Sequence, residues 1–131
     1  EKNFPVRKAR STLDIALPDG TGDDEYLAML EARLPRLLDD FEPDILLYQA
    51  GVDPHEDDKL GRLALSDEGL KRRDSYVVGQ ARRRGLPIAS ALGGGYGTDP
   101  RVVAERHARS MIAMADENAR HRSSTTQPVA S

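Results

Sequence analysis

The pattern of hydrophobic and polar positions along the chain predicts helices joined by short buried strands. Leucines recur three or four positions apart after Asp23, which predicts a first helix that ends before Pro43. Ser66 is a suitable N-cap for a second helix, and Gly85 is a suitable C-terminal stop for it. Asp99, followed by a proline, predicts the start of a third helix that runs to about residue 118.

Two apolar runs, 45–50 and 88–92, separate these helices. Both are continuous rather than alternating, which predicts strands buried on both faces. The order strand, helix, strand, helix predicts an α/β fold with a parallel crossover. Two strands cannot cover themselves, so an exposed sheet that favours association is expected. Looser alternation over 11–17 predicts a short edge strand.

Composition narrows the function classes. The chain has 131 residues, a formal charge of −3 and no cysteine, which excludes disulfides and thiolate metal sites. Neither a nucleic-acid partner nor a membrane partner is indicated, because the chain has no basic excess and no apolar run long enough to cross a membrane. We therefore expect a cytoplasmic protein. Residues 1–118 are expected to be ordered, and 119–131 form a polar tail that we expect to be disordered.

Asp53 follows the first apolar run, where ligands of parallel sheets bind. It is either a metal ligand or the start of an Asp-Pro turn, and spacing alone favours the turn. His55 shares a face with Asp53 in an extended segment, yet a histidine beside several carboxylates is more typical of a hydrogen-bonded loop residue. Asp57 and Asp58 are interpreted as solvated charges or acceptors that brace the loop. On helix 66–84, the arginines at 72 and 73 are expected in solvent.

Tyr96 follows three glycines at the end of the second apolar run. Its hydroxyl is a candidate donor to a developing oxyanion. The alternatives are an exposed ring on a flexible turn, or a phosphate cradle between a strand and a helix start. Thr98 stands where a dinucleotide-binding pattern needs glycine, so a nucleotide-binding α/β module is the weakest of these hypotheses.

Several motifs in order resemble the zinc-dependent histone deacetylase family, and most closely its bacterial branch. They are Pro18-Asp19-Gly20-Thr21-Gly22-Asp23, Phe41-Glu42-Pro43-Asp44, Ala50-Gly51-Val52-Asp53-Pro54-His55, Asp58-Lys59-Leu60-Gly61-Arg62-Leu63 and Gly93-Gly94-Gly95-Tyr96. The resemblance implies a partial three-layer arginase/deacetylase-type fold, with residues 1–118 as the C-terminal part of a deacetylase domain. It also implies hydrolysis of an acetyl amide on lysine or a polyamine, with Zn²⁺ as cofactor.

By position in these motifs, the resemblance implies that Asp53 is the last of three zinc ligands and that Tyr96 is catalytic. It implies that Leu60, Gly94 and Gly95 line the substrate tunnel. The paired histidines and the Asp-x-His pair that the family places earlier are absent from this sequence. We therefore expect this chain to be inactive alone. The alternative is a non-catalytic remnant that acts as an interaction module.

Overall fold

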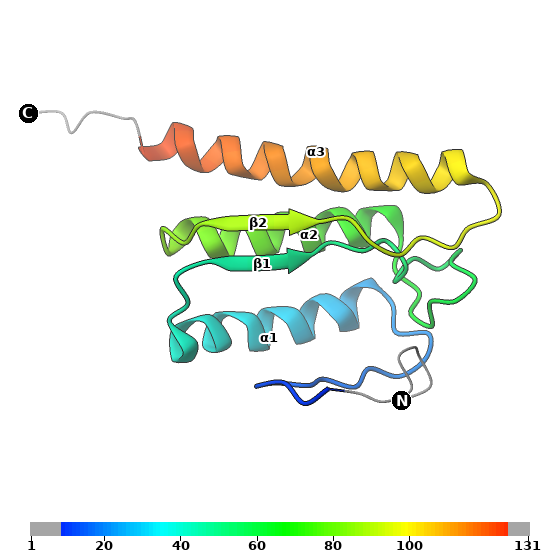
Figure 1. Cartoon of the computed structure of the whole chain (residues 1–131), viewed down its shortest axis with the longest axis horizontal. Coiled ribbons are helices and arrows are strands. Elements are labelled where there is room, and N and C mark those ends of the chain that lie inside the picture. The colour runs from blue at the N-terminus through cyan, green and yellow to red at the C-terminus, as the bar shows by residue number, and fades with distance from the viewer. Residues whose placement is uncertain (1–8, 126–131) are drawn as a thin grey trace, which may run out of the picture.

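The computed structural model describes residues 9–125, which form three helices and two strands in the predicted order (Figure 1). The helices are α1 (Asp23–Phe41), α2 (Asp67–Arg83) and α3 (Pro100–Thr125), and the strands are β1 (Leu46–Gln49) and β2 (Ile88–Ala91). The strands pair in parallel, with Leu46 opposite Ile88 and Gln49 opposite Ala91. The predicted α/β class and the parallel crossover through α2 are therefore confirmed.

Local hydrogen bonds account for both ends of α2. The Ser66 hydroxyl accepts from the Gly69 N–H at 3.0 Å, as an N-cap does. The Asp23 carboxylate accepts from the Ser66 N–H at 2.8 Å and from its hydroxyl at 2.5 Å, so the start of α1 also fixes the start of α2. At the other end Gly85 has φ +65° and the Leu86 N–H donates to the Ala81 carbonyl at 2.9 Å. This is the predicted glycine stop.

The helices cover one face of the two-stranded sheet. Figure 1 shows the strands in front of α2, with α1 and α3 on either side of it. Leu46, Tyr48 and Ile88 face the helices and join their apolar clusters. Leu47 points away and is 75% exposed. The prediction that both strands are buried on both faces is wrong for this chain, because its helices all lie on one side.

Two further expectations need correction. Residues 11–17 contain no strand, because they have no strand to pair with in the part of the chain that the structure describes. Helix α3 continues to Thr125, so residues 119–125 are helical rather than a disordered tail. Residues 126–131 lie outside the described residues. Between residues 9 and 125, no helix is both long and apolar enough to cross a membrane.

Candidate functional site

The candidate site lies where the chain leaves the two parallel strands. Backbone pairing continues past both strands: the Ala50 N–H donates to the Ala91 carbonyl at 2.9 Å and the Val52 N–H donates to the Gly93 carbonyl at 3.1 Å. Parallel strands end at the same edge of a sheet, so Asp53 and the glycine loop emerge side by side.

Asp53 and Gly94 are in direct contact across these two loops. A Cβ atom built on Gly94 would collide with Oδ1 of Asp53, and Gly94 has φ +64°. A side chain at position 94 would therefore be strained by the backbone and would displace the carboxylate. The structure thus brings Asp53 together with Gly94, one of the glycines for which the family resemblance implies substrate binding.

Asp58 connects the first loop to Tyr96. Its Oδ1 accepts from the N–H groups of Leu60 at 2.9 Å and Gly61 at 2.7 Å, and its Oδ2 accepts from the Tyr96 N–H at 2.7 Å. Burial acts to raise the pKa of the Asp58 carboxyl, but these three donors and the charge of Arg106 together hold it below its ordinary value. The interpretation of Asp58 as a loop-bracing acceptor is confirmed.

The side chains of Leu60 and Tyr96 remain accessible at this junction. Leu60 is 64% exposed and Tyr96 is 51% exposed, and the Lys59 N–H donates to the Tyr96 carbonyl at 3.3 Å. The contacts therefore fix the two backbones relative to each other and leave both side chains facing solvent. Such side chains are available to a substrate.

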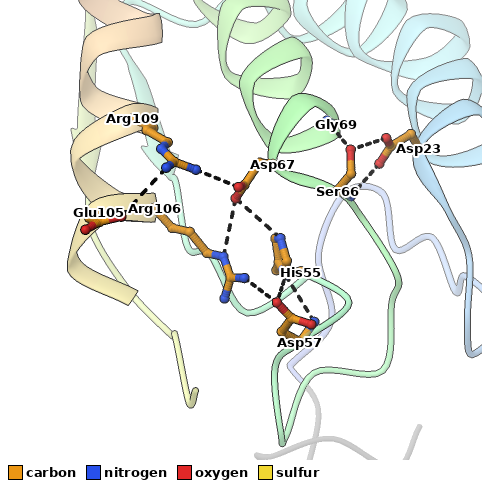
Figure 2. Close-up of polar contacts among 9 residues, drawn as sticks. All are labelled: Asp23, His55, Asp57, Ser66, Asp67, Gly69, Glu105, Arg106 and Arg109. Carbon is orange, nitrogen blue, oxygen red and sulfur yellow. Dashed lines mark hydrogen bonds and ion pairs between the residues drawn. The ribbon is translucent and has the colours of Figure 1, made fainter. Parts of the chain in front are cut away.

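The His55 side chain lies between its own loop and the helices that carry Asp67 and Arg106, in a charged network rather than in a ligand set (Figure 2). Its Nδ1 accepts from the Asp57 N–H at 3.0 Å, and its Nε2 lies 3.4 Å from Oδ1 of Asp67. Arg106 of α3 reaches Asp57 at 2.5 Å and Asp67 at 3.3 Å. A buried His55 that bonds within the loop agrees with the expectation from the sequence. Through Asp67 and Arg106, the network connects the loop to both α2 and α3.

A second charged network lies beneath β1 and was not predicted. Arg73 is 3% exposed, which overturns the expectation that it is in solvent. Its Nε donates to Asp74 at 2.9 Å and its Nη1 donates to the Gly51 carbonyl at 2.8 Å. The Tyr48 hydroxyl donates to the same Asp74 oxygen at 2.6 Å, and burial raises the pKa of that phenol. The signal was available, since positions 73 and 74 fall between Leu70 and Val77 on the apolar face of α2.

The described residues do not form a metal centre by themselves. Among residues 9–125, no group of three or more His, Cys, Asp or Glu side chains is arranged to hold a metal ion. A catalytic zinc normally takes three protein ligands. Asp53 alone therefore does not fit a complete zinc site, and the roles inferred for Asp53, Tyr96, Leu60, Gly94 and Gly95 remain predictions.

Solved structures share this fold. An acetylpolyamine aminohydrolase from Burkholderia pseudomallei superposes with a TM-score of 0.64 and 24% identity, over 78% of this chain and 28% of that one. The HD domain of HDA15 superposes with a TM-score of 0.58 and 21% identity, over 79% of this chain and 29% of that one. The chain thus has part of the arginase/deacetylase fold.

Sequence comparison agrees with the structural similarity. An uncharacterised protein of Picosynechococcus sp. is 44% identical over 107 residues, which are 82% of this chain and 36% of that protein. Histone deacetylase 2 of Arabidopsis thaliana is 35% identical over 101 residues, which are 75% of this chain and 26% of that protein. This chain thus spans about a third or less of the length of these relatives. The model of the histone deacetylase domain matches residues 3–114, and the chain belongs to the histone deacetylase family.

Proposed function

We propose that this chain forms one side of the active site of a zinc-dependent deacetylase. In this proposal Asp53 is one zinc ligand and Tyr96 donates a hydrogen bond to the oxyanion that forms from the acetyl carbonyl. The observation that carries the proposal is the junction of the two loops. Asp53 contacts Gly94, and Asp58 binds the Tyr96 N–H at 2.7 Å. Family membership supports the same roles.

The remaining zinc ligands must come from outside the described residues, because one carboxylate cannot hold a catalytic zinc. Zinc supplies Lewis-acid chemistry when it is bound. The chain accounts for 36% of the Picosynechococcus relative and 28% of the aminohydrolase, which leaves most of such a domain to supply those ligands. We therefore propose that the 131-residue chain does not hydrolyse substrate alone.

The substrate proposed for the complete site is an acetylated lysine or an acetylated polyamine. Leu60 is 64% exposed, and its N–H donates to the same Asp58 carboxylate as the Tyr96 N–H. Its side chain offers an apolar contact to an alkyl chain. Gly94 and Gly95 are proposed to line the wall of the substrate tunnel. The space that a Cβ would take there is filled by Asp53 and Val103, so both backbones pack directly against these side chains. A hydrogen-bond donor aimed at a developing oxyanion commonly lowers the activation free energy by about 3–4 kcal/mol.

The second candidate function is a non-catalytic interaction module. It is favoured by the uncovered sheet face, where Leu47 is 75% exposed and Ile45, two positions earlier on the same face, is 52% exposed. Exposed apolar side chains on one face are typical of an interaction surface. We propose that its occupant is the remainder of a deacetylase domain. The test is binding of this chain to the part of the Picosynechococcus relative that lies outside the matched region. Loss of binding in Leu47→Lys would support the proposal, and unchanged binding would contradict it.

A chimaera tests the proposed catalytic role. This chain replaces the matched 107-residue region of the Picosynechococcus protein, and release of acetate is measured from an acetyl-lysine peptide and from an acetylpolyamine. We expect chelator-sensitive activity, loss of bound zinc in Asp53→Asn, and retained zinc with at least about 100-fold lower kcat in Tyr96→Phe. Activity indifferent to a chelator, or unchanged in Asp53→Asn, would contradict the proposal.

A further inference from the structure

The residues on either side of Tyr96 restrict its backbone conformation very little. Gly94 and Gly95 precede it with φ +64° and +93°, and Gly97 follows it. Glycines restrict the backbone least of all residues, so the conformation of this loop has to be set by its contacts. The Tyr96 side chain is 51% exposed, which means that packing in the core does not hold it.

Two hydrogen bonds fix the Tyr96 backbone, and both come from the loop after β1. The Tyr96 N–H donates to Oδ2 of Asp58 at 2.7 Å, and the Tyr96 carbonyl accepts from the Lys59 N–H at 3.3 Å. The bond to Asp58 is the shorter one and its acceptor is a carboxylate, so it is the stronger of the two.

The other carboxylate oxygen of Asp58, Oδ1, binds the backbone of its own loop. Oδ1 accepts from the N–H groups of Leu60 and Gly61, which closes the turn of its own loop. The carboxylate thus has one oxygen for each loop. A side chain with a single acceptor oxygen can serve one loop but not both.

We propose that Asp58 is a positioning residue for Tyr96: its carboxylate fixes the backbone of the tyrosine and, through the backbone, the place of the phenol. The catalytic part of this inference rests on the function proposed above. The structural part does not, because it concerns a hydrogen bond that is present in the chain itself.

Amide hydrogen exchange in the 131-residue chain, followed by NMR, tests the structural part. The variants are Asp58→Ala and Asp58→Asn, and Glu56→Gln is the matched control because it removes an exposed carboxylate from the same loop. We expect the Tyr96 amide to exchange at least about tenfold faster in Asp58→Ala. The Val52 amide, which is bonded to Gly93, should exchange as before.

Asp58→Asn should speed the exchange of either the Tyr96 amide or the Leu60 and Gly61 pair, but not of both. Glu56→Gln should change none of them. Tyr96 exchange that stays at the wild-type rate in both Asp58 variants would overturn the proposal. So would a rise at Val52 by the same factor as at Tyr96, since that would mean general destabilisation.

A double-mutant cycle in the chimaera tests the catalytic part. If Asp58 acts through the tyrosine, Asp58→Ala lowers kcat about tenfold or more with little change in KM, and it has little further effect in a Tyr96→Phe background. Equal losses in both backgrounds would overturn this part. A chimaera in which Tyr96→Phe has no effect would instead refute the proposed function, while the exchange result would stand.

Discussion

The buried pair Arg73–Asp74 gives the sharpest prediction for stability, because both charges are almost fully removed from solvent. Arg73 is 3% exposed and Asp74 is 0% exposed. The change Arg73→Met keeps a long apolar stem but removes the cation. It leaves the Asp74 carboxylate buried with the Tyr48 hydroxyl as its remaining donor, and it removes the donor to the Gly51 carbonyl.

The expected loss follows from what is left unpaired. Removing one partner of a buried ion pair typically costs about 3–5 kcal/mol of unfolding free energy. Tyr48→Phe removes one hydrogen bond to a charged group and should cost about 1.5–3 kcal/mol. Arg72→Met is the matched control on the same helix. The Arg72 side chain is 49% exposed and its Nη1 lies 3.5 Å from Asp24, so Arg72→Met should cost less than about 0.5 kcal/mol.

Urea unfolding followed by circular dichroism measures these losses on the whole chain. A typical domain has only about 5–15 kcal/mol of stability, so Arg73→Met should shift the unfolding midpoint strongly. The triple variant Tyr48→Phe, Arg73→Met, Asp74→Leu removes the network together and should recover more than half of the loss. If Arg73→Met unfolds at the same urea concentration as Arg72→Met, the burial argument is refuted.

Three other predictions test the loops and the start of α2. Gly20→Ala and Gly94→Ala both place alanine at positive φ, but only position 94 collides with Asp53, so Gly94→Ala should lose clearly more than the roughly 1 kcal/mol expected of Gly20→Ala in thermal unfolding. Ser66→Ala removes the cap of α2 and should cost about 0.5–2 kcal/mol in the same assay. The folded-state pKa of Asp58 is lowered, so its ionised form stabilises the fold above the ordinary value of about 3.9. The difference in unfolding free energy between wild type and Asp58→Asn should therefore be constant above about pH 5 and shrink as the pH falls below about 4, and a difference that grows on acidification would contradict this.

The helix ends were predictable because their signals are local. Ser66 and Gly85 carry their capping roles in their own chemistry, and both act as the sequence predicts. The end of α3 was missed by seven residues, since polar residues after 118 extend a helix as readily as they form a tail. A polar run has no marker that separates these two outcomes.

Burial was harder to predict because it depends on what the rest of the molecule covers. The run 45–50 is continuous and apolar, as in a strand with helices on both faces, yet Leu47 is 75% exposed. The described helices cover only one face of the strands, and the run itself carries no sign of which face stays open. The prediction that Arg73 lies in solvent was wrong because it followed from the charge of the side chain. The helical period instead places Arg73 on the buried face of α2, where it binds Asp74 under β1.

The contacts that hold the loops of the candidate site do not involve the uncovered face of the sheet. Asp53 is held against the Gly94 backbone, and the loop around it is tied to α2 and α3 by the network of His55 and Arg106 (Figure 2). None of these contacts involves Leu47 or the outward face of the strands. A partner that binds the proposed interaction surface around Leu47 would therefore leave these loop contacts in place. It follows that Leu47→Lys should impair association while the protection of the Tyr96 amide from exchange stays unchanged. A loss of that protection would show that the site and the open face are coupled.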